Sequence, residues 1–243
     1  MLNNFIDARQ FTFAPFPHPS HEGGTGDSGA LQLATSKTDP GLQYIVKNGF
    51  PELGCNEFMY HKVAAAVGLN AQEVRLFINR QYQQAAAIRY VPGARENDLS
   101  TATPENRAAF YGFEALFFIL NEDDSHEYYL DGTGRLFKLD NAASFKLNEA
   151  SLDLLRVGLF NGAIQPETDR YEPMRQALVR NYGDEASEPY LDVFRRFAAL
   201  DMAVFDEALD ALCRNYSASV AGYFHEFLQE RIKACGTYVE GLI

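Results

Sequence analysis

The sequence predicts an α+β fold in two lobes, a small β-rich lobe followed by a larger helical one. Two observations support this prediction. Short runs of alternating apolar and polar residues dominate up to about residue 95, and apolar residues at helical spacing dominate the rest of the chain. The expected domains are therefore a β-rich lobe at 1–95 and a helical lobe at 96–243. We expect a cleft between the two, because ligand sites form preferentially where domains meet.

The composition is that of a globular protein with a substantial core, since 47% of the 243 residues are hydrophobic and 22% are charged. Acidic side chains outnumber basic ones by 33 to 21, which gives a net charge of −12. Binding to nucleic acid or to an anionic membrane needs a basic patch, and the sequence has no run of lysine and arginine. We therefore expect neither a nucleic-acid surface nor a membrane as the main partner.

The cysteines and the start of the chain bear on its location. The three cysteines, Cys55, Cys213 and Cys235, are widely spaced and form no metal-binding or redox pair. Such a set suits a reducing compartment. No apolar stretch approaches the roughly 20 residues of a membrane span, and no signal peptide is visible. The sequence thus predicts a cytoplasmic protein, and secretion by a route that needs no signal peptide stays open.

The first predicted elements are short strands. Proline and aromatic residues exclude a helix over 11–19, and residues 23–30 are rich in glycine. Two strands are predicted at 31–35 and 42–47, joined by the turn signal Asp39-Pro40-Gly41. The second of these strands ends in a lysine.

A helix and two further strands complete the β-rich lobe. The helix is predicted over 54–68, with Gly68 in the position that commonly ends a helix. Strands at 73–78 and 84–91 follow, and the turn at Pro92-Gly93 closes the lobe.

The helical lobe opens with a strong helix signal. Thr103 suits the N-cap and Pro104 the first turn of a very apolar helix that ends near residue 120. An acidic loop at 121–127 leads into a hairpin, with strands at 128–130 and 135–140 around the turn Asp131-Gly132-Thr133-Gly134. From about residue 150 the chain is predicted to be helical, most clearly over 190–200, 202–216 and 219–233.

Five features follow one another in an order that suits phosphoryl transfer. They are the glycine-rich segment, Lys47 at a strand end, Glu57 near the start of a helix, Asp124 and His126 in the acidic loop, and Asp140 after the hairpin. Transfer from a nucleotide uses backbone amides and a lysine on the phosphates, a carboxylate that holds the lysine, an acid near the attacking hydroxyl and an acid for Mg²⁺.

At these residues the sequence resembles the HipA-like protein kinases, from about residue 23 to the C-terminus. Residues 45–47, 56–58 and 64–69 resemble the lysine strand and glutamate helix of that family, residues 121–126 its catalytic loop, and residues 139–140 its metal-binding aspartate. The resemblance implies a two-lobed protein-kinase-like fold, α+β, with a small β-rich N-lobe and a larger helical C-lobe. It also implies a short form that lacks the N-terminal subdomain of longer members.

The resemblance also implies roles for individual residues. Lys47 would bind the phosphates of ATP, Glu57 would pair with it, and Asp140 would hold Mg²⁺. In the catalytic loop, Asp124 would be the catalytic aspartate, with His126 beside it. The remaining nucleotide contacts would come from Gly24, Thr25, Gly26 and Ser28 at the phosphates and from the backbone of Tyr90 and Val91 at the adenine.

The acidic loop departs from the pattern of the family. Ser125 stands where the family has arginine, and Tyr129 stands where it has a metal-binding asparagine. Asp123 is an alternative to Asp124 as the catalytic aspartate. Glu127 and Asn121 are the candidates for the missing metal ligand.

The resulting hypothesis is an ATP- and Mg²⁺-dependent phosphotransferase, a Ser/Thr protein kinase that acts on a protein substrate. The alternatives are a kinase-fold enzyme that acts on a small molecule and a pseudokinase, that is, a nucleotide-binding or protein-interaction module without catalysis. The kinase hypothesis requires Lys47 and Glu57 within ion-pair reach. It also requires Asp140 within about 15 Å of Lys47, because both contact one triphosphate.

Overall fold

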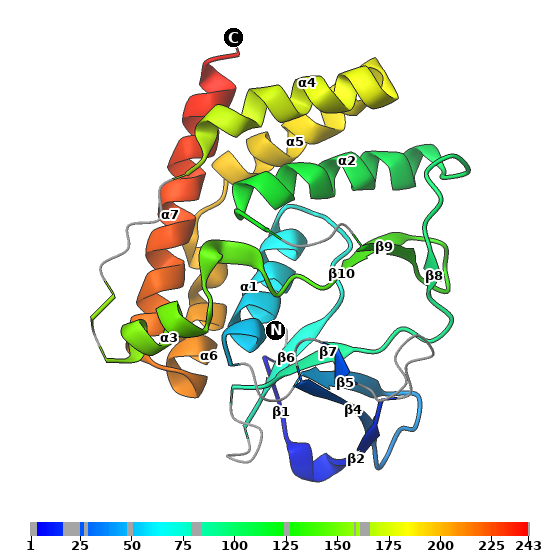
Figure 1. Cartoon of the computed structure of the whole chain (residues 1–243), viewed down its shortest axis with the longest axis vertical. Coiled ribbons are helices and arrows are strands. Elements are labelled where there is room, and N and C mark those ends of the chain that lie inside the picture. The colour runs from blue at the N-terminus through cyan, green and yellow to red at the C-terminus, as the bar shows by residue number, and fades with distance from the viewer. Residues whose placement is uncertain are drawn as a thin grey trace.

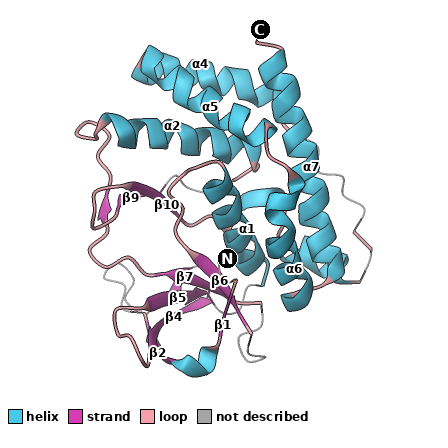
Figure 2. Ribbon diagram, turned by 180° about the vertical axis from the view of Figure 1, so that it is seen from behind, coloured by secondary structure: helices cyan, strands magenta, loops and turns pink. Residues whose placement is uncertain are grey.

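The computed structural model describes residues 4–16, 25–26, 29–47, 51–78, 84–123, 127–157, 159–160 and 166–242. It confirms the predicted α+β class with a small β-rich lobe and a larger helical lobe. Most of the strands gather at one end of the molecule, in the lower part of Figure 1. The same grouping of strands is visible from behind (Figure 2). None of the described helices is both long and apolar enough to cross a membrane.

Seven strands of the described chain form the sheet of the small lobe, in the order β1-β6-β7-β5-β4-β2 with β3 paired to β4. Only β1 and β6 are parallel, and the other paired strands in this sheet are antiparallel. The strands are β1 Phe5–Ile6, β2 Phe11–Pro15, β3 Thr25–Gly26, β4 Gly29–Ser36, β5 Gln43–Lys47, β6 Val74–Phe77 and β7 Ala86–Arg89. The four strands predicted between residues 31 and 91 are confirmed as β4 to β7.

The two faces of this sheet have different neighbours. Tyr44 and Val46 of β5 are buried in a small core that also contains Phe11 and Phe77. Because side chains alternate along a strand, Lys47 lies on the opposite face, which is covered by helix α1, Pro51–Ala66. The alternation of β5 therefore directs Lys47 toward α1.

Helix α1 approaches the sheet very closely at Gly54. A Cβ atom at this position would collide with the carbonyl oxygen of Gln84 and the hydroxyl of Tyr216. The Tyr216 hydroxyl donates to that carbonyl at 2.6 Å, and Oδ1 of the adjacent Asn215 accepts from the Gln84 amide at 3.1 Å. The end of a C-terminal helix is thus fastened to the start of β7, and glycine is required where the three segments meet.

The larger lobe is built around the buried helix α2, Pro104–Ile119. Its N-terminus forms as predicted, because the hydroxyl of Thr103 accepts from the Asn106 amide at 3.2 Å. The remaining helices are α3 Glu149–Arg156, α4 Tyr171–Tyr182, α5 Ser187–Ala198, α6 Asp206–Asn215 and α7 Ala218–Glu240. The helix predicted over 202–216 begins with a 3₁₀ turn at Met202–Phe205 before α6.

A second sheet lies beneath α2, in the strand order β10-β9-β8 (Figure 1). It contains β8 Arg95–Glu96 and the predicted hairpin, β9 Glu127–Leu130 and β10 Leu136–Leu139. The side chain of Asn106 holds the hairpin to α2: Nδ2 donates to the Gly134 carbonyl at 2.8 Å, and Oδ1 accepts from the Leu136 amide at 3.0 Å. The hairpin is therefore fixed, and Asp140 directly follows its second strand.

Helix α1 packs into the same core as the helices of the larger lobe. Phe58 and Met59 of α1 are fully buried in the cluster that contains Phe113 of α2 and Phe224 of α7. The helix therefore connects the two lobes, with the small sheet on one side and the helical core on the other.

Candidate functional site

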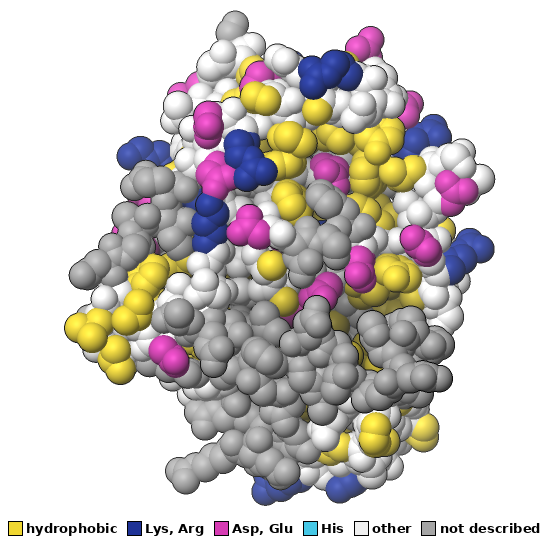
Figure 3. Space-filling model, viewed as in Figure 1, with side chains coloured by type: hydrophobic (Ala, Val, Ile, Leu, Met, Phe, Trp, Pro, Cys, Tyr) yellow, Lys and Arg dark blue, Asp and Glu magenta, His cyan; other side chains and the backbone are white. Residues whose placement is uncertain are grey.

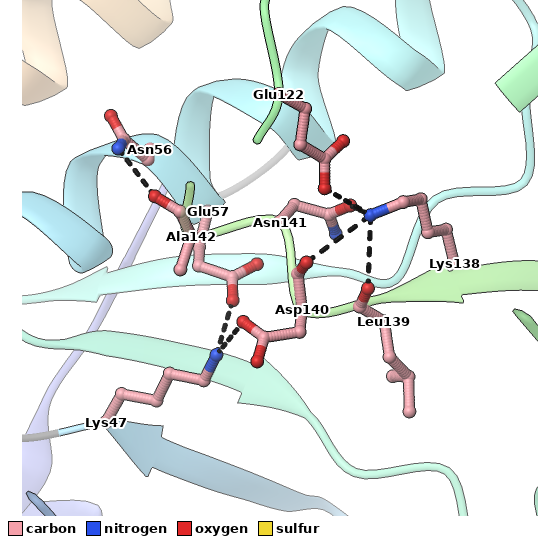
Figure 4. Close-up of polar contacts among 9 residues, drawn as sticks. All are labelled: Lys47, Asn56, Glu57, Glu122, Lys138, Leu139, Asp140, Asn141 and Ala142. Atoms are coloured by element: carbon pink, nitrogen blue, oxygen red, sulfur yellow. Dashed lines mark hydrogen bonds and ion pairs between the residues drawn. The ribbon is translucent and has the colours of Figure 1, made fainter. Parts of the chain in front are cut away.

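Lys47, Glu57 and Asp140 meet where the two lobes face each other. Lys47 Nζ lies 2.8 Å from Glu57 Oε1 and 2.6 Å from Asp140 Oδ1 (Figure 4). The lysine comes from the end of β5, the glutamate from α1 and the aspartate from the residue after β10. The required proximity of the three side chains is confirmed. The roles that the resemblance assigns to them stay predictions.

The electrostatic setting keeps this lysine charged. Burial would lower the pKa of Lys47, but the carboxylates of Glu57 and Asp140 outweigh burial and raise the pKa above its ordinary value. Burial opposes ionisation of Asp140 as well, yet Lys47 lowers the pKa of that carboxyl below its usual range. The Glu57 side chain is almost completely buried, whereas 41% of the Asp140 side chain is exposed. The Asp140 carboxylate is therefore accessible to solvent, whereas the Lys47 side chain is largely buried.

Asn56 ties the helix that carries Glu57 to the loop that follows Asp140. Its fully buried Nδ2 donates to the Ala142 carbonyl at 2.7 Å and to the Leu147 carbonyl at 2.9 Å. Asn56 and Glu57 are neighbours, so one turn of α1 fixes both the partner of Lys47 and the path of the chain after Asp140 (Figure 4).

A buried cation lies directly behind Asp140. Lys138 is 1% exposed, and its ammonium forms an ion pair with Glu122, which is 2% exposed. Lys138 Nζ also lies 3.0 Å from Asn141 Oδ1 and 3.3 Å from the Asp140 carbonyl oxygen (Figure 4). Asp140 has a φ of 49°, a left-handed conformation that non-glycine residues adopt only when their surroundings enforce it. The contacts of Lys138 with the Asp140 carbonyl oxygen and with Asn141 hold the backbone in this conformation.

The described part of the glycine-rich segment lies at the same end of the sheet as Lys47. Leu31 of β4 is the register partner of Lys47, and β3 pairs back on the residues just before Leu31, with Thr25 opposite Ala30 and Gly26 opposite Gly29. Thr25 and Gly26 therefore pair in antiparallel fashion with Gly29 and Ala30 at the Lys47 end of the strands. Two of the four residues predicted to contact phosphates, Gly24 and Ser28, lie outside the described residues.

Tyr90 and Val91, which are predicted to contact adenine, follow β7 directly. The Tyr90 amide donates to the Gln43 carbonyl at 2.9 Å, and the Val91 carbonyl accepts from the Ala94 amide at 3.3 Å. These two backbone groups are thus engaged within the protein. An adenine contact by this segment stays a prediction.

The acidic loop is described only in part, because Asp124, Ser125 and His126 lie outside the described residues. Asp123 is exposed, whereas Asn121 is buried with a φ of 51°. The side-chain amide of Asn121 has no hydrogen-bond partner among the described residues.

Glu127, the second candidate metal ligand, lies at the start of β9. It is exposed and pairs with Leu139, the residue before Asp140. Within the described ranges, no group of three or more histidine, cysteine, aspartate or glutamate side chains is placed to hold a metal ion. The metal ligands other than Asp140 stay predictions.

The tyrosines that follow the acidic loop occupy the start of the hairpin. The Tyr128 hydroxyl points into the lobe and donates to Glu114 Oε1 at 2.6 Å, and Tyr129 is half-buried. Tyr129, which the sequence resemblance aligns with the metal-binding asparagine of the HipA-like family, is paired with Phe137 across the hairpin. No amide ligand is available from this strand position.

Sequence reasoning missed the supporting residues Asn56, Glu122 and Lys138. Lysine in a short strand is usually solvated, so Lys138 gave no signal by residue type. Its position did carry one, because Lys138 stands between Phe137 and Leu139 in an otherwise apolar strand. The partner of Lys138 is Glu122, an acidic residue 16 positions earlier in the chain.

Comparisons with known proteins support the fold. No family model matches the sequence, and no curated protein matches it either. The structure is similar to the crystal structure of a Helicobacter pylori proinflammatory kinase, CtkA, with a TM-score of 0.58 and 13% sequence identity over 94% of this chain and 96% of that one. The chain therefore has a two-lobed protein-kinase-like fold, α+β, with a small β-rich lobe and a larger helical lobe.

Proposed function

We infer that this protein is an ATP- and Mg²⁺-dependent phosphotransferase, a Ser/Thr protein kinase of the HipA-like type. One observation carries the inference: Lys47 Nζ lies between Glu57 Oε1 and Asp140 Oδ1, on three elements that the fold brings together from both sides of the interlobe region. A lysine held by a helix glutamate, next to an aspartate after a hairpin, is the arrangement with which protein kinases hold a nucleotide triphosphate.

Each of the three side chains has a chemical task in this proposal. Lys47 binds phosphate oxygens of ATP. The buried carboxylate of Glu57 holds the Lys47 ammonium in place through their ion pair. Asp140 has an open, ionised carboxylate, which is the ligand type that Mg²⁺ prefers. When bound, the metal neutralises negative charge on the phosphates.

The acceptor is a serine or threonine hydroxyl of another protein. Its oxygen forms the new bond to the γ-phosphorus while the bond to ADP breaks, and its proton passes to an aspartate of the acidic loop. Asp124 is the first candidate for this aspartate and Asp123 the second. The protein contributes mainly position and electrostatic stabilisation, because the transfer itself needs little covalent chemistry from the enzyme.

The test uses the full chain with ATP labelled at either the γ- or the α-phosphate, with Mg²⁺ or with excess chelator, and with a mixture of Ser/Thr-containing proteins as acceptors. We expect label transfer from the γ-position only, dependent on Mg²⁺, and loss of transfer in Asp140→Asn. Asp210→Asn is the matched control, because Asp210 is an exposed residue of α6 with only a long contact to Arg214. Transfer of the α-label, or equal rates in both variants, contradicts the proposal.

The second candidate function is a nucleotide-binding module without catalysis. The resemblance places Tyr129 at the position of the family's asparagine ligand, and this substitution supports it. In that case ATP binding depends on Lys47, yet no γ-label is transferred to any protein or small-molecule acceptor. A transfer assay and a binding assay on the same preparation separate the two functions.

A further inference from the structure

A pocket lies on the larger lobe, and Lys47, Glu57 and Asp140 are not among its described lining residues. Its cavity of about 370 Å³ is bounded by β8, β9, the middle of α2 and the end of α4. This volume falls in the range of small-ligand sites. Over α2 and the strands beneath it, the surface shows an area of hydrophobic side chains with acidic side chains around it (Figure 3).

The polar groups of the pocket are two carboxylates and an amide. Glu96 is exposed at the end of β8, and Glu114 of α2 is 6% exposed and accepts from the Tyr128 hydroxyl at 2.6 Å. Asn97 is anchored by its backbone amide, which donates to the Tyr128 carbonyl at 2.9 Å. Of the described residues that line the pocket, none is lysine or arginine. The lining thus offers negative charge and hydrogen-bond acceptors.

Asn97 is the group that indicates a missing ligand. Its side-chain oxygen and nitrogen are both shielded from solvent and have no hydrogen-bond partner among the described residues. Buried polar atoms in proteins are nearly always hydrogen-bonded, and an unsatisfied one is destabilising. A donor that enters the pocket would satisfy the Asn97 carbonyl oxygen once the side chain turns from its shielded position toward the pocket.

The walls of the pocket are aromatic. The ring of Phe110 contacts those of Tyr128 and Tyr182, with centroids 5.0 Å and 5.6 Å apart. Tyr182 is 42% exposed and stands at the pocket as the last residue of α4. The negative faces of such rings attract organic cations.

We propose that this pocket binds the cationic end of an alkyl chain, a guanidinium or a primary ammonium group. The exposed carboxylate of Glu96 supplies the charge that meets the ligand, the Asn97 carbonyl oxygen accepts an N–H bond, and the aromatic rings cover the alkyl carbons. An anion is disfavoured by both carboxylates, and a purely apolar ligand leaves Asn97 unsatisfied. The proposal is independent of phosphoryl transfer, since it uses none of the residues around Lys47.

The experiment measures binding of three small probes of equal length: butylguanidinium, butylammonium and the neutral butylurea. Two-dimensional amide spectra of the ¹⁵N-labelled full chain report binding at the Asn97 side-chain amide. We expect saturable binding of one or both cations, with shifts at Asn97, and affinity for butylurea that is at least about tenfold weaker, because a charged donor is replaced by a neutral one. Equal affinity for the urea, or no shift at Asn97, overturns the proposal.

Variants at the rim locate the site without disturbing the core. Glu96→Gln and Tyr182→Ala alter exposed side chains and are each expected to weaken cation binding by about fivefold to tenfold. Glu240→Gln, at the exposed end of α7, removes the same charge elsewhere and should leave binding unchanged. Unchanged affinity in both rim variants overturns the proposal.

A competition experiment distinguishes two sources of the cation. If a pentapeptide with a central arginine competes with butylguanidinium, the ligand is a protein side chain. If the pentapeptide does not compete, the ligand is a free small cation.

Discussion

Lys47 Nζ lies 2.6 Å from Asp140 Oδ1, although 93 residues separate the two along the chain. The contact joins the sheet of the small lobe to the hairpin of the larger lobe, and Glu57 completes it from α1. Two oppositely charged groups from different lobes are thereby fixed side by side, at the site that we propose for a triphosphate and its metal ion.

The first prediction concerns the charge of Lys47. Lys47→Met should lower phosphoryl transfer by about 10²–10³-fold, since removal of one preorganised donor has an effect of that size. Because the substitution leaves the buried Glu57 without this cation, Lys47→Arg is the second variant. It keeps the charge but replaces a compact ammonium with a planar fork, and it should fold yet transfer poorly. Initial rates with Lys233→Met, an exposed position of α7, provide the control. Transfer at the wild-type rate in Lys47→Met would refute the role of this residue.

The second prediction concerns ligand-induced stability. Mg²⁺ and ATP together should raise the melting temperature well above either one alone, because Asp140 and Lys47 contact the two ligands jointly. At a ligand concentration of about 100 Kd the free energy of unfolding rises by about 2.7 kcal/mol. In Asp140→Asn the additional effect of Mg²⁺ should disappear, whereas in Asp210→Asn it should persist. Thermal melts that do not respond to millimolar nucleotide and metal would count against the site.

The third prediction concerns the buried pair of Lys138 and Glu122. Lys138→Met should lower the free energy of unfolding by about 3–5 kcal/mol, because it leaves Glu122 buried without this partner. The double variant Lys138→Met/Glu122→Met should be more stable than the sum of the single effects predicts, by at least about 1 kcal/mol. Denaturant titrations of the four proteins measure this coupling. Additive effects would show that the two side chains do not depend on each other.

The fourth prediction concerns Asn56. Asn56→Ala removes two buried hydrogen bonds to the Ala142 and Leu147 carbonyls and should lower the free energy of unfolding by about 2–3 kcal/mol. Asn56→Asp should be worse, because it places a carboxylate against two carbonyl oxygens. Asn4→Ala, which removes a single exposed bond to the Glu207 carbonyl, is the matched control. A loss in Asn56→Ala no larger than in this control would be inconsistent with the proposed coupling of α1 to the Asp140 loop.

The fifth prediction concerns pH. Burial lowers the pKa of His61 from 6.5 to about 4, with a smaller contribution from the charge of Lys62. Between these two values the unfolded chain binds more protons than the folded one, so the free energy of unfolding falls as the pH drops from 6.5 to 4. The total loss is about 3 kcal/mol, since one pKa unit corresponds to about 1.4 kcal/mol. His61→Asn should flatten this slope in unfolding titrations. His225→Asn, at an exposed site, should leave it as it is. An equally steep slope in His61→Asn would exclude His61 as its cause.

The sequence allowed prediction of those features that depend on local pattern. The turn signal before residues 42–47 located the strand that ends at Lys47, and Thr103-Pro104 located the start of α2. The grouping of Lys47, Glu57 and Asp140 came from their order along the chain and from the resemblance to the HipA-like kinases. The support beneath the site depends on tertiary contacts. Lys138 has the residue type of a surface position, and its burial depends on tertiary contacts with Tyr60 of α1 and with Glu122. The hydrogen bonds of Asn56 link segments 86 and 91 residues apart, which no local pattern reveals.

The most direct test of the account is a crystal structure of the full chain with Mg²⁺ and a nonhydrolysable ATP analogue. The account predicts that the phosphates lie against Lys47 Nζ, that the metal is bound by a carboxylate oxygen of Asp140, and that Lys47 keeps its contact with Glu57. An analogue bound elsewhere, with the ion pair between Lys47 and Asp140 intact, would contradict it.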